Sequence, residues 1–459
     1  MESILNVIQY FVNMGASVML PIIIFIVALC LGQKPGKALK SGISIGIGFI
    51  GIDLVINLML ENLAPAASAM AENFGINMNV IDVGWPGSAP MTWASNIALI
   101  AIPVAILVNI IMLVFKMTKV VNIDIWNIWH YAFTGALVHI ATNSFLLGIL
   151  AVVIHAALSY KLGDWFAPVA DEYFGLEGVT VPHGSAAWLA PIAVPIDSLL
   201  DKIPFINKID INADKIEKKF GIIGDPAIIG GTLGVLIGIL AGYSVDQILS
   251  LGIQMAAVII LMPQVVKHIM TGLLPVSEAA KSMLEKKFKG EKFYIGLDPA
   301  LLLGDSTVVT ASLIFIPLTI IIAVFVPNNE VLPFGDLATI GFFVAMAVGI
   351  HKGNLFRTLI SGSVLMGITI WISNQTIGLQ TILAQNAGQL ADATSKVASL
   401  DQGGSPITYI LTQAFNITNI WGFVGIGGMY VGCLIFTYFW YRKNYVNNVN
   451  KEELEECDI

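Results

Sequence analysis

Polar side chains that could bind a solute lie inside apolar stretches of this sequence. Residues 124–143 are apolar enough for lipid, yet they carry His130, His139, Thr142 and Asn143. On a helix, His139 and Asn143 share one face because they are four residues apart. A neutral histidine offers one donor and one acceptor, and asparagine offers both kinds, which suits a polyhydroxy solute better than a metal or a strong cation. We therefore expect substrate binding at His139 and Asn143; the alternative is that they hydrogen-bond neighbouring helices.

A second polar group interrupts the apolar run VPHGSAAWLAPIAVPID, residues 181–197, which also contains three prolines. Proline and glycine free backbone polar groups, and at membrane depth such breaks are tolerated where they line a cavity. We interpret His183, Gly184 and Ser185 as the tip of a broken helix that faces substrate. A purely structural kink is the alternative.

Two further segments, VGWPGSAPMTW and IGLDPALLLGDSTVV, occupy matching positions in the two halves of the chain. Half-helices beginning at Ser88 and Ser306 would direct backbone N–H groups at a ligand oxygen. Asp305 and Ser306 could also contact hydroxyl groups, although Asp305 is equally suited to an ordinary helix N-cap. Asp298, with proline directly after it, is more typical of a cap and is left out of the expected site.

The composition places these residues in a helical membrane protein. The chain is 56% hydrophobic and 12% charged, with a mean hydropathy of +0.81. Its apolar runs are continuous over about 20 residues, as helices that cross a bilayer require and as the alternating strands of a barrel do not. Cys30, Cys433 and Cys457 are scattered singly, without a disulfide or metal pattern. No cofactor, metal site, catalytic nucleophile or nucleic-acid partner is expected.

The hydropathy pattern predicts about eleven transmembrane helices, several of them broken or re-entrant. The expected spans are 4–31, 39–62, 88–115, 125–158, 178–200, 222–242, 246–272, 295–326, 334–351, 356–376 and 418–441. The breaks are expected in the spans that begin at 88, 178 and 295, because each contains internal proline or glycine.

The distribution of lysine and arginine predicts the orientation. With the N-terminus outside, every basic residue except Lys161 and Lys396 falls on the cytoplasmic side, including the C-terminal tail. The C-terminus is therefore expected on the cytoplasmic side. The lysine-rich segments 201–221 and 277–293 could dock an acidic cytosolic partner, or simply follow the positive-inside rule.

The chain also contains an internal repeat. Asp124 and His139 recur as Asp336 and His351 at an offset of about 210 residues, with other polar landmarks in the same order. Halves with an odd number of spans lie in opposite orientations, and such repeats are typical of transporters with a midplane site. The predicted organisation is 1–200 (first repeat of five spans), 201–221 (cytoplasmic basic loop), 222–376 (second repeat of five spans), 377–417 (outer re-entrant or capping segment) and 418–459 (terminal span and tail).

Several long blocks resemble one known family. VIDVGWPGSAPMTWASNIALIAIPVAILVN, NIDIWNIWHYAFTGALVH, VVIHAALSYKLGDWFA, VLPFGDLATIGFFVAMAVGIHKGNLFRTLISG and DQGGSPIT are similar to the galactitol permeases, IIC components of the bacterial phosphoenolpyruvate-dependent sugar phosphotransferase system. The resemblance implies a homodimer in a bacterial plasma (inner) membrane, with a dimerising scaffold and a mobile, elevator-like core. It also implies that a cytosolic IIB component, phosphorylated on cysteine by way of IIA, phosphorylates the bound galactitol.

Carried over motif by motif from the related ascorbate permeases, the site residues would be the Gly87-Ser88 tip, His139, Asn143, the His183-Gly184 tip and Asp305. Phosphotransferase activity would then arise only together with IIA and IIB.

The residues leave two other functions open. An ion-coupled secondary transporter of a small polar solute would use Asp53 or His139 for coupling. A membrane enzyme acting on lipid would use histidine and aspartate as acid and base. The sequence does not select the particular hexitol that a permease would carry.

Overall fold

The computed structural model describes residues 16–75, 78, 80–211, 226–287, 293–333, 335–388, 390 and 396–446. The described chain is mostly helical with a few short strands, which confirms the predicted all-α class. Parts of the two lysine-rich segments predicted to dock a partner, 212–221 and 288–292, lie outside the described residues, as does the side chain of Asp53.

The elements of the first half are α2 (Ala16–Cys30), α3 (Pro35–Asn73), β1 (Val80–Asp82), α4 (Gly84–Trp93), α5 (Asn96–Val114), β2 (Val120–Asn122), α6 (Ile125–Thr142), α7 (Phe145–Glu172), β3 (Val179–Thr180), α8 (Ala190–Leu200) and η1 (Ile206–Lys208).

The elements of the second half are α10 (Pro226–Leu240), α11 (Val245–Lys287), β4 (Tyr294–Gly296), η3 (Pro299–Gly304), α12 (Ser306–Phe325), β5 (Val331–Leu332), η4 (Leu337–Thr339), α13 (Ile340–Ile350), α14 (Leu355–Asn386), β6 (Val397–Ala398), α15 (Pro406–Phe415), α16 (Ile420–Tyr441) and η5 (Arg442–Val446).

Helices long and apolar enough to cross a membrane occur throughout the described residues. There are five, Asn96–Val114, Phe145–Glu172, Ser306–Phe325, Leu355–Asn386 and Ile420–Val446, and shorter apolar helices accompany them. This agrees with a polytopic membrane protein without fixing the number of spans.

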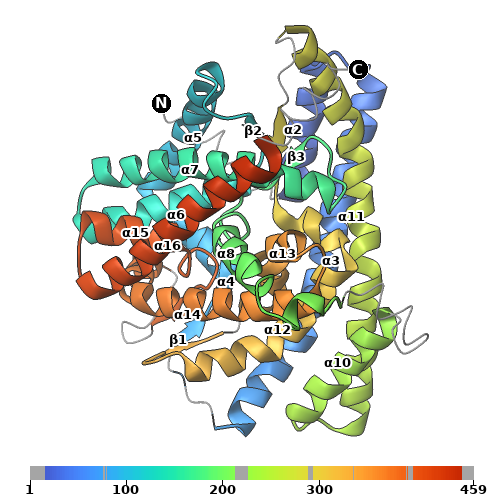
Figure 1. Cartoon of the computed structure of the whole chain (residues 1–459), viewed down its shortest axis with the longest axis vertical. Helices are drawn as coiled ribbons and strands as arrows, with labels where there is room; N and C mark the ends of the chain where they lie inside the picture. Colours follow the sequence, from blue (N-terminus) through green and yellow to red (C-terminus); the bar gives the residue numbers. More distant parts are fainter. Residues whose placement is uncertain are drawn as a thin grey trace.

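Helices α2, α3, α10 and α11 pack on one another and form one side of the molecule, with α11 running along its edge (Figure 1). Glycine permits this close packing. A Cβ atom on Gly42 would lie 2.8 Å from the carbonyl oxygen of Pro21, and one on Gly51 would lie 2.5 Å from Val265. The remaining helices form the other side, which holds the polar clusters.

Strands from the two halves of the chain pair with one another. One parallel three-stranded sheet has the order β5-β1-β6 and the other has the order β2-β4-β3. Ile81 pairs with Leu332 and Val397, whereas Ile295 pairs with Val121 and Val179. In the two repeats β1 would correspond to β4, β2 to β5 and β3 to β6. Replacing each strand by its counterpart turns the order β5-β1-β6 into β2-β4-β3. The two halves are therefore interlocked in equivalent ways.

The span predicted at 125–158 is wrong, because the chain turns back within it. Helix α6 ends at Thr142, Asn143 adopts a left-handed conformation with φ 52°, and the Ser144 hydroxyl accepts a hydrogen bond from Leu147 N at 3.3 Å to begin α7. Asparagine tolerates this conformation better than most residues, and serine is a favourable N-cap. The resulting helical hairpin was not recognised because its two arms read as one apolar run.

The predicted spans put Lys161 on the outer side of the membrane, but it lies beside a loop that they put on the inner side. Its ammonium group donates to the carbonyl oxygen of Met117 at 3.0 Å and to Asp164 at 3.1 Å. Met117 lies in the loop with Lys116 and Lys119, which was predicted to be cytoplasmic. Lys161 therefore groups with the basic residues that the sequence assigned to the inner side.

The two predicted half-helices differ. Helix α12 begins at Ser306, as predicted. Helix α4 begins at Gly84 instead of Ser88, because Gly84 takes φ 62° and the first backbone N–H groups find carboxylate acceptors. Gly84 N donates to Asp82, two residues before it, and Trp85 N donates to the distant Asp336. Ser88 consequently lies in the second turn of α4.

Candidate functional site

The unwound segment at 181–189, called tip 1 here, contacts α6 through His130. The backbone N–H of Gly184 donates to His130 Nδ1 at 3.1 Å. The imidazole rings of His130 and His183 are 4.0 Å apart and nearly perpendicular. Both side chains are buried. The broken helix predicted around His183 and Gly184 thus lies against a histidine nine residues before the one predicted to bind substrate.

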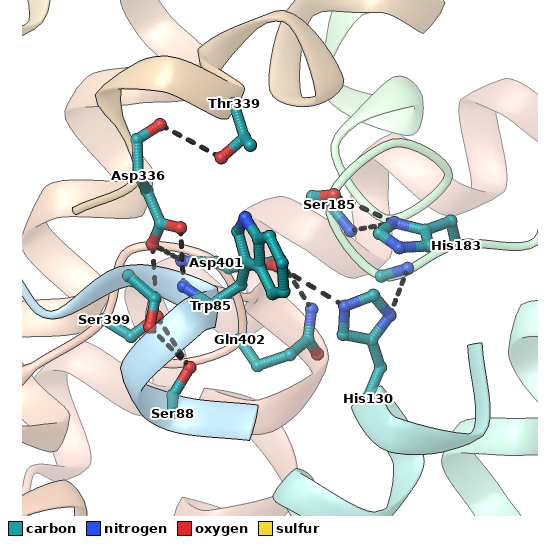
Figure 2. Close-up of polar contacts among 12 residues, drawn as sticks. Trp85, Ser88, His130, His183, Ser185, Asp336, Thr339, Ser399, Asp401 and Gln402 are labelled. Atoms are coloured by element: carbon teal, nitrogen blue, oxygen red, sulfur yellow. Dashed lines mark hydrogen bonds and ion pairs between the residues drawn. The ribbon is translucent and has the colours of Figure 1, made fainter. Parts of the chain in front are cut away.

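A second unwound segment, residues 399–405 or tip 2, faces tip 1 (Figure 2). Asp401 Oδ2 lies 3.5 Å from His130 Nε2, and Gln402 Nε2 donates to Asp401 Oδ1 at 3.3 Å. A Cβ atom on Gly184 would collide with Gln402 Nε2 and with the His130 ring. Glycine is therefore required where the two tips meet.

The hydrogen bonds of the two histidines fix which ring nitrogen carries the proton. Nδ1 of His130 accepts from Gly184 N, and Nδ1 of His183 accepts from Ser185 N at 3.4 Å and contacts the Ser185 hydroxyl at 2.9 Å. A neutral imidazole has one donor nitrogen, so each Nε2 carries the hydrogen. His183 Nε2 lies 3.5 Å from Asp298 Oδ2, as His130 Nε2 does from Asp401.

Several buried polar atoms around this contact have no hydrogen-bond partner within the described chain. Nε2 of His130 and Oε1 of Gln402 lie in the contact, and Nε1 of Trp129 and Oδ1 of Asn127 belong to neighbouring residues of α6. Leaving a buried donor or acceptor unpaired costs ~1–3 kcal/mol. Both donors and acceptors are present, so a molecule rich in hydroxyl groups could satisfy them.

The position of tip 2 depends on two buried carboxylates, one of which is Asp336. Asp336 Oδ1 accepts from Trp85 N at 2.8 Å, and its Oδ2 accepts from Asp401 N at 2.9 Å and from the Ser399 hydroxyl at 3.2 Å. One side chain therefore fixes both tip 2 and the start of α4 (Figure 2).

Asp82 completes this support from the end of β1. Its Oδ1 accepts from Gly84 N at 2.9 Å and from Leu400 N at 3.1 Å, and its Oδ2 accepts from Asp336 N at 3.0 Å. A glycine at 335 lets these backbones approach, since a Cβ there would lie 2.5 Å from Gly84 N.

Of the predicted residues, Ser88 and Gly87 lie beside this assembly. The Ser88 hydroxyl lies 2.9 Å from Gly84 O and 3.3 Å from the Ser399 hydroxyl, and its single hydrogen can be donated to either. A Cβ on Gly87 would lie 2.7 Å from Val83. Ser88 therefore reaches tip 2 through its side chain and not through a helix N-terminus.

His139 and Asn143 lie at the other end of α6. His139 lines a cavity of about 340 Å³ together with Ser95, Asn96 and Asn386, and His183 is not among its lining residues. Its Nδ1 is buried without a partner among the described residues. The structure does not bring His139 to tip 1, because positions nine residues apart point to opposite sides of a helix.

Asp305 and Ser306 lie at the start of α12. Asp305 Oδ1 accepts from Thr307 N and Val308 N, both at 2.9 Å, and Oδ2 accepts from the Tyr173 hydroxyl at 3.1 Å. This carboxylate serves as the N-cap that the sequence offered as the alternative. The backbone carbonyl oxygen of Ser306 accepts a hydrogen bond from the Thr310 hydroxyl.

Sequence reasoning missed His130, Asp298, Asp401 and Gln402 as members of this contact. His130 lies in the same segment as His139. The four-residue spacing of His139 and Asn143 predicted substrate binding at those two residues and not at His130. Asp298 is both a cap, accepting from Ala300 N at 2.7 Å, and a neighbour of His183. The motif DQGGS gave the available signal for tip 2, since glycines after polar residues indicate an unwound segment.

Comparisons with known proteins show the family of this chain. A model of the EIIC-GAT family, described as the sugar-specific permease component of the PTS system, matches residues 10–394. The chain belongs to this family of phosphotransferase-system permeases and is a multi-pass membrane protein. The galactitol-specific EIIC component of the PTS system from Escherichia coli (strain K12) is 60% identical over 433 residues, which are 94% of this chain and 96% of that protein. The protein of the same description from Escherichia coli O157:H7 is equally similar.

Proposed function

We propose that this protein carries galactitol, or a closely related hexitol, to the cytoplasm as the IIC component of a phosphotransferase system. The observation that carries the proposal is that Nε2 of His130 and Oε1 of Gln402, both buried where α6 meets the tips, have no hydrogen-bond partner among the described residues. The 60% identity to a relative described as galactitol-specific supports the choice of substrate.

The chemistry of the contact favours a polyol. The Nε2–H groups of His130 and His183 are donors, and each has a carboxylate oxygen, of Asp401 or Asp298, 3.5 Å away. A hydroxyl oxygen about 2.8 Å from both atoms of such a pair can accept from the imidazole and donate to the carboxylate. A hexitol offers several such hydroxyls, and a substrate lacking one leaves a buried group unpaired.

The equivalent sheets support two inverted repeats related through the membrane plane. In this proposal the eleven spans are α2, α3, α4–α5, α6, α7, α10, α11, η3–α12, η4–α13, α14 and α16. The segments with β3 and α8, and with β6 and α15, then enter from opposite sides as re-entrant elements. Because β6 corresponds to β3, the second repeat extends to Phe415, beyond the boundary expected at 376. The N-terminus is outside and the C-terminus is cytoplasmic.

Transport follows as vectorial phosphorylation. The helices on both sides of the tips form a core that moves in an elevator-like manner against a scaffold of α2, α3, α10 and α11, which also forms a homodimer. Once the core faces inward, a phosphorylated IIB component, recharged by IIA, transfers its phosphoryl group to the hexitol. The charge on the product then prevents its return across the bilayer.

Labelled galactitol added to membranes that contain this chain and phosphorylated IIB tests the function. We expect labelled galactitol phosphate, with none formed when IIB is omitted and no effect of an uncoupler. Phosphate on a different sugar would overturn the specificity. Uptake without IIA and IIB that collapses with an uncoupler would instead favour an ion-coupled transporter.

A further inference from the structure

A cavity of about 700 Å³ lies between the ends of α7, α8, α13 and α16 and the start of α14. Its lining includes charged side chains of both signs: Glu172, Asp197, Asp201, Lys352 and Arg357. Its volume is within the range of pockets that hold small molecules. By the predicted orientation it is the cavity on the cytoplasmic side, and it is called the inner cavity below.

The cavity lined by His139 differs in its charge. Its lining residues are Met91, Ala94, Ser95, Asn96, Ala136, His139, Ile140, Leu383, Asn386 and Ala387, which include no lysine, arginine or carboxylate. The inner cavity is thus lined by the cationic side chains of Lys352 and Arg357, and the lining of the cavity beside His139 contains no lysine or arginine. Of these two cavities among the described residues, the inner cavity is the one with cations that a negatively charged ligand could contact.

Arg357 is the central cation of the inner cavity. Its Nη1 lies 2.8 Å from Asp197 Oδ1 and 2.7 Å from Asp201 Oδ1. Within the described residues its Nε and Nη2 make no polar contact, so part of the guanidinium fork is available. The ammonium group of Lys352, which lines the same cavity, has no partner in the described part of the chain either.

The two carboxylates on Arg357 are not equivalent. Asp197 also accepts from His351 Nδ1 at 2.7 Å, while His351 Nε2 is held by the Ser361 hydroxyl at 2.7 Å. Within the described residues the Asp201 carboxylate pairs with Arg357 alone, and it is 60% exposed, whereas the Asp197 side chain is 20% exposed. Solvent screens the exposed carboxylate of Asp201, so it gains less from the ion pair than Asp197 does. Asp197 therefore orients the guanidinium, and Asp201 can be displaced by another anion.

We propose that the inner cavity binds the phosphate monoester of the transported hexitol, with Arg357 and Lys352 as its phosphate ligands. Arginine fits phosphate because its planar fork donates two parallel hydrogen bonds, and lysine adds a point charge. The phosphate displaces Asp201 and takes the unused face of Arg357. Because the other cavity has no such cation, the site favours departure of product toward the cytoplasm. This inference rests on the proposed function.

Calorimetry of galactitol 1-phosphate binding to the purified full chain tests the site, with galactitol and inorganic phosphate as parallel ligands. We expect Arg357→Gln and Lys352→Gln each to weaken binding of the phosphate monoester by about tenfold or more, because a hydrogen bond to a charged group contributes ~1.5–3 kcal/mol. Binding of galactitol should change less than about threefold. Lys202→Gln, an exposed lysine outside the lining, is the matched control.

Several results would overturn the assignment. Unchanged affinity for the phosphate monoester in both variants would do so, as would an Arg357→Gln variant that loses both ligands while Lys352→Gln loses neither. The second pattern would mean that Arg357 stabilises the fold and does not bind the phosphate group. If the variants bind product normally but accept phosphate from IIB slowly, the cations serve the partner's phosphoryl group and not the product. Failure of the unaltered chain to bind galactitol would instead count against the proposed function.

Discussion

His130 and His139 lie on one helix, and their imidazoles meet different surroundings. His130 contacts both tips, whereas His139 lines a separate cavity at the end of α6. The hydrogen-bond pattern leaves the Nε2–H of His130 without an acceptor in the described chain. If a hexitol binds between the tips, this donor is one that it must satisfy.

His130→Ala should weaken galactitol binding by about tenfold or more, because one hydrogen bond of ~1–2 kcal/mol and the orientation of tip 1 are lost. His139→Ala is the matched control on the same helix and should stay within about twofold. Equilibrium binding of labelled galactitol to the purified chain measures both. A larger loss of affinity in His139→Ala than in His130→Ala would place the binding site at His139 and Asn143.

Gly184→Ala should abolish galactitol binding, because the added methyl group collides with Gln402 and His130 and forces the tips apart. Gly425→Ala on α16, where a Cβ meets nothing within 4 Å, should leave binding unchanged. The same binding assay, with thermal unfolding of each variant as a fold control, makes the comparison. Normal affinity in a folded Gly184→Ala protein would contradict a site between the tips.

At the scale of elements, the unwound tips are held by carboxylates from distant parts of the chain. Asp336, at the start of η4, accepts hydrogen bonds from α4 and from tip 2. The strands provide the register for these contacts, because Asp82 ends β1 and its partner strand β6 leads directly into tip 2.

Asp336→Asn should destabilise the protein by ~1–3 kcal/mol, since an amide has only one acceptor oxygen and turns an NH₂ group toward a backbone donor. Thermal unfolding in detergent should show a lower Tm together with weaker galactitol binding. Glu330→Gln, which removes an exposed ion pair with Lys396, should change stability by less than ~1 kcal/mol. Equal Tm values for the two variants would mean that Asp336 does not support the tip.

The sequence was informative about elements whose signals are local. Continuous apolar runs predicted the helical class, the His183-Gly184 break predicted tip 1, and Asp305 before Ser306 predicted the start of α12. It did not predict the start of α4, because that helix is capped by Asp336 from the other half of the chain. Nor did it predict the hairpin at Asn143, since the polar residues Thr142 and Asn143 were interpreted as part of a binding face and not as a turn between two apolar helices.

The candidate site shows the same difference between local sequence signals and contacts made only in the fold. The sequence predicted a broken helix at His183 and Gly184, and the structure has an unwound segment there, while the role of these residues in binding stays a prediction. The contact of this segment with tip 2 was not predicted, because Gln402 and Asp401 reach His130 only after the halves interlock through their strands. Pairing within one helix, as for His139 and Asn143, is the only pairing that spacing can suggest.

For the whole molecule, the proposed orientation puts the His139 cavity outside and the inner cavity in the cytoplasm. In a chain whose native cysteines are replaced by serine, Asn386→Cys should react with a membrane-impermeant maleimide in intact cells. Lys352→Cys should react only after the cells are permeabilised. The opposite labelling pattern would reverse the topology and the proposed direction of product release.

The most direct measurement is a cryo-electron microscopy structure of the full chain with galactitol bound. Our account predicts ligand density between tip 1 and tip 2, with hydroxyl groups within hydrogen-bond distance of His130 Nε2, His183 Nε2 and Gln402 Oε1. Density in the cavity beside His139, with the contact between the tips empty, would contradict it.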